Sequence, residues 1–234
     1  MMAELTIKAA DGGSFSSYLA LPEQAAARAP VVLVIQEIFG VNQVMRDTCD
    51  WLASEGYIAC CPDIFWRIEP GIQLSDQSEE ETKRAFELFG LFDVEKGIED
   101  LRATLSTLRQ HERSNGKVGT VGYCLGGKLA YLMACRSDVD ASVGYYGVGL
   151  DELLGEASNI SKPLMLHIAT EDKFVSKDAQ AKIHQSMDGN PLVTLHDYEG
   201  TDHAFARVGG EHYDAEAARL ANQRTLDFFK QHLA

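Results

Sequence analysis

Apolar and polar residues alternate on both sides of an Asp-Gly-Gly turn at the start of the chain. In "LTIKAADGGSFSSYLALP" each flank has the period of two that a half-buried strand requires, and the turn residues separate the flanks. The next run, "APVVLVIQE", is rich in β-branched residues and has no polar alternation, which is typical of a strand buried on both faces. The pattern predicts an N-terminal hairpin followed by a buried strand of a parallel sheet.

The remainder of the chain repeats this alternation of strands and helices. Apolar residues from Val41 to Leu52 share one helical face that ends before Gly56. Further strands are predicted at "YIACCPD", "GKVGTVGY", "ASVGYYG", "KPLMLHIA" and "LVTLHDY", and further helices over about Glu79–His111, Leu125–Cys135, Asp178–Met187 and Glu211–His232. The fold class is therefore α/β, with a mostly parallel central sheet and helices on both faces. No repeat or linker divides the chain, so we expect one domain over residues 1–234, in which Arg67–Ser78 is a candidate lid or an irregular loop.

Composition and charge narrow the classes of partner. The net charge of −14 repels phosphate backbones, and the 21 Lys and Arg are scattered, so nucleic acid is excluded as a partner. No apolar run approaches the length of a membrane span, and Glu4, Lys8 and Asp11 interrupt the place of a secretion signal. The five cysteines include no CxxC pair and no zinc-type spacing. We expect a cytoplasmic monomer that binds a small-molecule substrate and neither membrane, metal nor cofactor.

The segment "GYCLGG" places Cys124 between a predicted strand and a predicted helix. It has the form G-x-C-x-G, the strand-turn-helix elbow that exposes a nucleophile, with cysteine in place of serine. The helix that begins at Leu125 aims its N-terminal amides at this position and favours a thiolate. The alternative is that Cys124 is a small buried core residue, which is the commoner fate of a free cysteine.

An acidic residue and a histidine follow the next two buried strands. Asp172 lies after "KPLMLHIA" and His203 after "LVTLHDY", so the order along the chain is nucleophile, acid, histidine, as in α/β hydrolases. Asp172 could instead cap the helix that follows it, and His203 could be an ordinary histidine. Glu171 and Asp202 are the alternative choices for the acid.

Four motifs taken together resemble those of the dienelactone hydrolase (carboxymethylenebutenolidase) family of α/β hydrolases, over nearly the whole chain. They are "QEIFGVN", "GYCLGG", "TEDKFV" and "DHAFAR". The resemblance implies an α/β-hydrolase fold and a triad of Cys124, Asp172 and His203. It also implies that Glu37 holds or deprotonates the resting thiol, and that substrate binding disturbs this contact and sends the thiolate toward His203. The alternative for Glu37 is that it is a surface charge at the end of a strand, without a functional role.

The same resemblance suggests how a substrate would be bound. The oxyanion hole would use the backbone amides of Leu125 and Ile38. Family substrates carry a carboxylate that arginines clamp, which points to Arg207 and, by position, to Arg84. Arg84 could instead lie on a solvated helix face, and its neighbour Lys83 could take its place.

The resulting functional hypothesis is a cofactor-independent hydrolase that opens an enol-lactone, of the type that converts dienelactone to maleylacetate in the degradation of aromatics. One alternative is a general carboxylesterase or thioesterase of the same fold. The other is a non-catalytic binding protein that retains the scaffold and its pocket.

Overall fold

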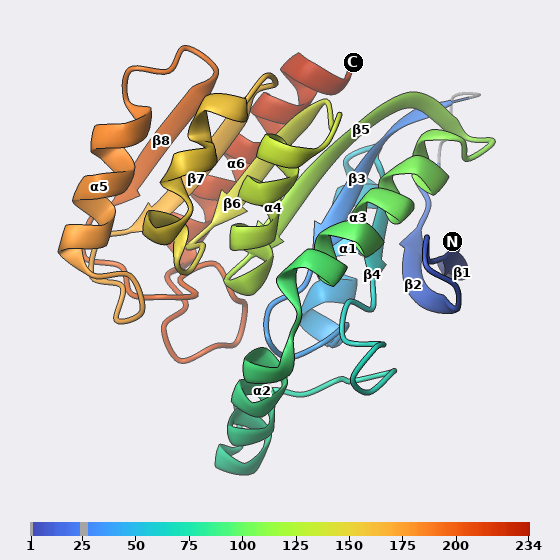
Figure 1. Cartoon of the computed structure of the whole chain (residues 1–234), viewed down its shortest axis with the longest axis horizontal. Helices are drawn as coiled ribbons and strands as arrows, with labels where there is room; N and C mark the ends of the chain where they lie inside the picture. The colour runs from blue at the N-terminus through green and yellow to red at the C-terminus, as the bar shows by residue number, and fades with distance from the viewer. Residues whose placement is uncertain (1, 24–27) are drawn as a thin grey trace. The chain divides into compact units, whose positions relative to one another are not determined.

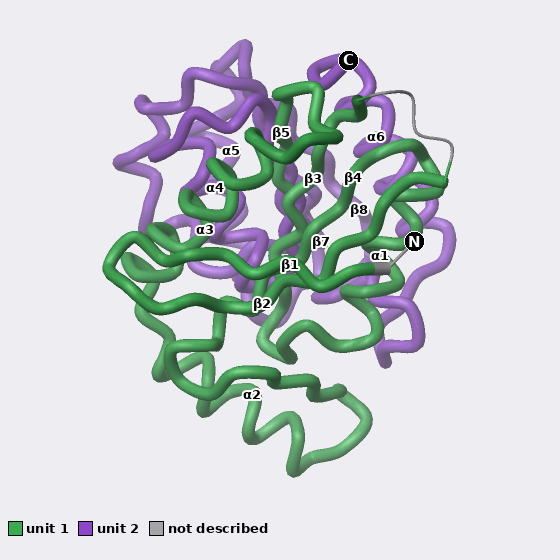
Figure 2. The backbone as a smooth tube through the Cα atoms, turned by 90° about the vertical axis from the view of Figure 1, so that its right-hand side faces the viewer, with its two compact units in different colours: residues 1–120 green, residues 121–234 purple. Residues whose placement is uncertain are grey.

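The strands form one eight-stranded sheet in a computed structural model that describes residues 2–23 and 28–234. Their order is β1-β2-β4-β3-β5-β6-β7-β8 (Figure 1). The chain divides into two compact units, unit 1 over Met1–Thr120 and unit 2 over Val121–Ala234, which Figure 2 distinguishes by colour. The expectation of a single domain over residues 1–234 stays a prediction. None of the helices described here has the length and apolar character needed to cross a membrane.

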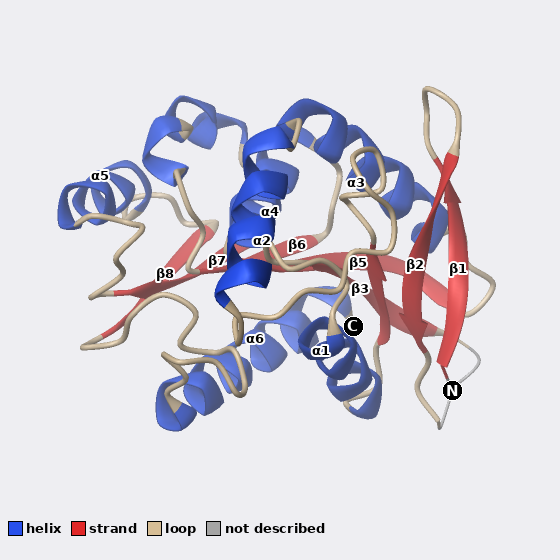
Figure 3. Ribbon diagram, turned by 90° about the horizontal axis from the view of Figure 1, so that it is seen from below, coloured by secondary structure: helices blue, strands red, loops and turns tan. Residues whose placement is uncertain are grey.

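Unit 1 holds the N-terminal hairpin and the first parallel strand pair. Its elements are β1 (Met2–Lys8), β2 (Ser14–Ala20), β3 (Ala29–Ile35), α1 (Gln43–Ser54), β4 (Ile58–Pro62), α2 (Glu79–Leu91), α3 (Val94–Arg109) and most of β5 (Ser114–Tyr123). The pairs β1/β2 and β2/β4 are antiparallel, whereas β3/β4 is parallel, so the predicted hairpin is confirmed. The β-branched residues of β3 are completely buried because α1 and α3 cover opposite faces of the strands (Figure 3).

Unit 2 contains three parallel strands and the helices that cover them. After the end of β5 come α4 (Leu125–Arg136), β6 (Ala141–Tyr145), the 3-10 helices η1 (Leu150–Glu152) and η2 (Leu154–Asn159), β7 (Leu164–Ala169), α5 (Lys177–Met187), β8 (Val193–Tyr198) and α6 (Ala215–Leu233). The pairs β6/β7 and β7/β8 are parallel. Figure 3 shows α4 and α6 on opposite faces of these strands, as the alternation of apolar runs predicted.

Two helix predictions were wrong at their boundaries. The helix expected over Glu79–His111 is interrupted, because Phe92 is extended and the Asp93 side chain accepts a hydrogen bond from the Lys96 amide, which starts α3. The helix expected from Glu211 begins instead at Ala215, where the Asp214 side chain accepts from the amides of Glu216 and Ala217. In both cases a capping aspartate decided the boundary.

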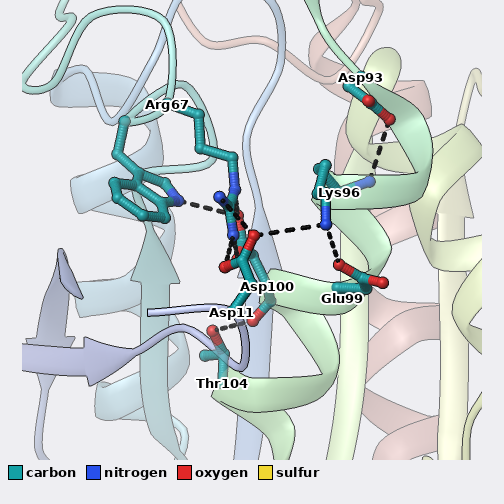
Figure 4. A network of polar contacts seen from close by, with 8 residues as sticks. Asp11, Arg67, Asp93, Lys96, Glu99, Asp100 and Thr104 are labelled. Carbon is teal, nitrogen blue, oxygen red and sulfur yellow. Dashed lines mark hydrogen bonds and ion pairs between the residues drawn. The ribbon is translucent and has the colours of Figure 1, made fainter. Parts of the chain in front are cut away.

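The segment Arg67–Ser78, the candidate lid, is anchored within unit 1. Figure 4 shows the Arg67 guanidinium between Asp11 of the hairpin turn and the buried Asp100 of α3. Arg67 donates to both carboxylate oxygens of Asp100 at 2.8 Å, which is a bidentate pair. Farther along, the Gly71 amide donates to Asp63 at 2.7 Å. These contacts fix the beginning of the segment to the hairpin and to α3; its role as a lid stays a prediction.

Candidate active site

Cys124 occupies a strained turn between β5 and α4. It is the N-cap of α4 and has φ 56° and ψ −114°, a conformation that L residues rarely adopt, and its amide donates to the Tyr145 carbonyl at 3.1 Å. A Cβ added to Gly122 would lie 1.9 Å from the Gly126 carbonyl oxygen, so the turn closes only with glycine at this position. The predicted elbow is therefore present in the backbone.

Helix α4 lies directly against the backbone of β6, which sets the place of the cysteine. A Cβ added to Gly127 would approach the Tyr145 carbonyl oxygen to 2.6 Å and the Gly147 Cα to 2.9 Å. Leu125 is the first residue of α4, so its amide belongs to the first turn, where helix amides have no intrahelical acceptor. Such an amide is suited to stabilise an oxyanion next to Cys124.

Asp172 and His203 form a buried pair. His203 Nδ1 lies 2.8 Å from Asp172 Oδ2, and both side chains are almost completely removed from solvent. The other carboxylate oxygen, Oδ1, accepts from the amides of Phe174 at 2.8 Å and Val175 at 3.2 Å. Asp172 thus holds the turn before α5 and orients the histidine at once. The N-cap of α5 is Ser176, so the alternative role of Asp172 as the cap of that helix is wrong.

The electrostatics of the site favour a protonated His203. Burial by itself lowers the pKa of this imidazole, but the charge of Cys124, the hydrogen bond with Asp172 and a hydrogen bond with the Cys124 side chain raise it to about 10. Within unit 2, His203 therefore contacts both Cys124 and Asp172. A histidine that holds its proton beside a thiol stabilises the thiolate, the nucleophilic form of cysteine.

The two alternative acids make other contacts. Glu171 pairs with Lys177 at 2.8 Å and both side chains are largely exposed. Asp202 pairs with Lys173 at 2.7 Å and accepts from the amide of His203 rather than from its ring. Asp172 is the carboxylate that reaches the imidazole.

Two aromatic residues that the sequence did not single out pack on the His203 ring. Tyr146 and Phe174 each meet it edge to face, with centroids 5.1 and 4.8 Å away, and Phe174 is 58% exposed. Tyr146 has φ 37° and Ala204 has φ 63°; with Cys124 they are the non-glycine residues of positive φ in the described chain. These strained residues are Cys124 itself, the residue that follows His203 and the residue that follows β6. Backbone strain of this kind collects at functional sites.

The remaining predicted site residues lie in both units. Arg207 belongs to unit 2, in the turn after His203, where its amide donates to the Ala204 carbonyl at 2.9 Å. Glu37 and Ile38 follow β3 in unit 1 and are buried; Glu37 is 2% exposed and is not a surface charge. Arg84 lies on α2 in unit 1 and pairs with Glu69 at 2.6 Å and Glu87 at 3.0 Å.

The sequence gives a partial indication that Phe174 lies near His203, and none for Tyr146. Phe174 stands two residues after Asp172, so it lies close along the chain to the residue that contacts His203. The positive φ of Tyr146 depends on the path of the chain after β6, and no residue pattern indicates it. Among the described residues, no group of three or more His, Cys, Asp or Glu side chains could hold a metal ion.

Comparisons of the sequence with known proteins point to one family. The model of the dienelactone hydrolase family matches residues 15–233. A protein of Azospirillum brasilense is 52% identical over 99% of this chain and 100% of its own length. A carboxymethylenebutenolidase of Pseudomonas putida is 44% identical over 96% of this chain and 94% of its own. A solved α/β hydrolase of Penicillium, 14% identical, superposes with a TM-score of 0.74 over 100% of this chain and 99% of its own, which confirms the predicted α/β-hydrolase fold.

Proposed function

This chain belongs to the dienelactone hydrolase family and is a hydrolase of lactone or ester bonds, and we propose that it opens an enol-lactone through a triad of Cys124, His203 and Asp172. The observation that carries the proposal is the arrangement inside unit 2. A cysteine on a strained elbow contacts a histidine whose pKa is raised to about 10 and whose Nδ1 lies 2.8 Å from a buried aspartate. This is the arrangement that nucleophilic catalysis requires.

The reaction proceeds in two stages. The Cys124 thiolate attacks the lactone carbonyl, a C–S bond forms, and the ring C–O bond breaks with the ring oxygen leaving as an enolate. The enolate takes up the proton that His203 removed from the Cys124 thiol and becomes its keto form, which leaves His203 neutral. Water then attacks the thioester while His203 takes a proton from the water, the C–S bond breaks, and that proton passes from His203 to the sulfur, which releases the carboxylic acid and restores the thiol. An enolate needs little protonation to leave, so ordinary esters and amides should react slowly.

Further residues complete the proposed site. The amides of Leu125 and Ile38 would bind the oxyanion, and Arg207 would bind the substrate carboxylate, with Arg84 as a second clamp. Arg84 already pairs with two carboxylates of α2 and of the segment before it, so a substrate would have to compete with Glu69 and Glu87. We further propose a cytoplasmic monomer without a cofactor.

The first test compares substrates and removes the sulfur. We expect the wild type to hydrolyse dienelactone, measured by the loss of ring absorbance, much faster than p-nitrophenyl esters. Cys124→Ala should lose turnover in both assays. Preference for the simple esters would favour the general esterase. Retention of more than a few per cent activity in Cys124→Ala would exclude Cys124 as the nucleophile. Equal labelling of all five thiols by iodoacetamide would favour a binding protein.

A second test concerns Glu37, whose burial is expected of a residue that controls the resting thiol. An anion near the thiol disfavours the thiolate, so Glu37→Gln should speed the alkylation of Cys124 by iodoacetamide in the free enzyme. It should also lower kcat, because the proposed transfer of the sulfur from Glu37 to His203 on substrate binding is lost; of these two positions, the structure shows the sulfur against His203. The measurement is the alkylation rate across pH, with and without a carboxylate ligand. Unchanged alkylation and unchanged kcat would leave Glu37 without a gating role.

A further inference from the structure

Asp202 connects the two loops that carry the acid and the base. Its Oδ1 accepts from the His203 amide at 2.7 Å and from the Lys173 amide at 3.2 Å. Lys173 directly follows Asp172, and Asp202 directly precedes His203. One carboxylate oxygen therefore bonds to the backbone beside each member of the Asp172–His203 pair.

The second oxygen of Asp202 faces a lysine and a histidine from the same region. Oδ2 lies 2.7 Å from Lys173 Nζ and 3.7 Å from His212 Nε2, and the side chain is only 16% exposed. Burial raises the pKa of Asp202, but the hydrogen bonds of Lys173 and of the His203 amide, together with the nearby His212, outweigh it and lower the pKa below its ordinary value. Asp202 is ionised at neutral pH and remains a strong acceptor for both amides.

The two loops need such a connection near their tips. At their bases the Glu171 amide donates to the Thr201 carbonyl at 2.8 Å, which continues the pairing of β7 and β8. Beyond that bond the loops diverge from strand geometry, and Ala204, next to His203, has φ 63°. A strained residue beside the base keeps its conformation only where neighbouring contacts determine it.

We propose that Asp202 is a positioning residue, which fixes the distance between Asp172 and His203 by bonding to the amides of Lys173 and His203. The inference rests on the proposed function in that His203 is the base of the reaction. Asp202 acts through the backbone and does not touch the substrate. Its role differs from that of Asp172, which contacts the imidazole itself.

Two substitutions separate the amide bonds from the ion pairs. Asp202→Asn keeps a side-chain oxygen that can accept from both amides, but removes the charge. Asp202→Ala removes both. We expect Asp202→Ala to lower kcat roughly ten- to hundredfold with KM changed less than about twofold, because a displacement of the base by a fraction of an ångström impairs proton transfer. Asp202→Asn should recover most of the lost kcat.

The matched control is Glu171→Gln, one residue before the acid. Glu171 also pairs with a lysine, but through an exposed side chain, and its backbone bond to Thr201 is kept. We expect this variant to keep the kcat of the wild type. A loss of thermal stability in Asp202→Ala with unchanged kcat, or an Asn variant as slow as the Ala variant, would overturn the proposal.

A readout that does not depend on turnover is the pKa of His203, followed by NMR from its ring proton. The bond to Asp172 helps to raise the pKa of His203, so a loosened pair should lower it. Both variants lack the charge of Asp202, so a lower pKa in Asp202→Ala than in Asp202→Asn would come from the lost amide bonds alone. An identical pKa in the two variants would contradict positioning. His203→Ala, assayed in parallel, tests the proposed function: if it retains activity, that function fails, while the NMR comparison still decides the role of Asp202.

Discussion

Replacement of Asp172 by asparagine tests whether the carboxylate selects the tautomer of His203. Oδ1 of Asp172 accepts two amide hydrogen bonds, from Phe174 and Val175, and Oδ2 faces Nδ1 of His203. In Asp172→Asn the single oxygen should stay with the two amides, so the NH₂ group should point at Nδ1. In the neutral imidazole Nδ1 then becomes an acceptor, the ring proton moves to Nε2, and the lone pair that takes the proton of the attacking water is lost.

The free-energy cost of restoring the correct tautomer of His203 sets the size of the fall in kcat. The asparagine would have to turn its NH₂ group toward the two amides, which leaves the amides of Phe174 and Val175, one part-buried and one buried, without an acceptor. Each unsatisfied donor costs about 1–3 kcal/mol, so the active arrangement lies about 2–6 kcal/mol higher. This corresponds to a fall in kcat of about thirtyfold to about twenty-thousandfold.

The assay is kcat on an enol-lactone at neutral pH, with unfolding in urea to show that the variant is folded. Glu171→Gln, the same carboxylate-to-amide change one residue earlier, should keep full activity because its side chain is exposed. The pKa of His203 should fall from about 10 in Asp172→Asn, since the bond from the carboxylate is lost. A kcat within threefold of the wild type in a folded variant would refute this reasoning.

Three further predictions concern packing, pH and substrate binding. Gly127→Ala should destabilise the protein by about 1–3 kcal/mol in urea unfolding, because the added methyl pushes α4 away from the Tyr145 carbonyl. The same shift should change the alkylation rate of Cys124. The control Gly155→Ala, where the added methyl enters open space, should change neither. The folded pKa of His203 lies above the ordinary 6.5, so its contribution to stability is complete below pH 6.5 and is lost as pH rises through about 10; the stability difference between wild type and His203→Gln should shrink over that range. Arg207→Ala should raise KM for lactones that carry a carboxylate and leave KM for neutral esters unchanged, and equal losses on both would indicate a structural role.

Local patterns in the sequence determined the elements and the elbow. The periods of the strands and helices depend on which side chains face the core. Gly122 is required by a close contact with the backbone a few residues later, and Gly127 by a close contact with the backbone of the next strand. The helix starts at Asp93 and Asp214 also depend on local residues, because each aspartate caps the helix that follows it. The predictions for Glu79–His111 and Glu211 were wrong because they followed the apolar periodicity and disregarded these caps.

Tertiary structure alone decided which carboxylate serves the histidine. Glu171, Asp172 and Asp202 all lie just after β7 or β8, and the sequence offers each of them as the acid. The parallel register of β7 and β8 and the turn capped by Asp172 bring one carboxylate to His203 Nδ1, while Glu171 points to Lys177 and Asp202 bonds to backbone amides. Side-chain direction in a loop depends on hydrogen bonds between segments about thirty residues apart. No pattern within one segment contains that information, so only the contact between the two loops distinguishes Asp172 from the other two carboxylates.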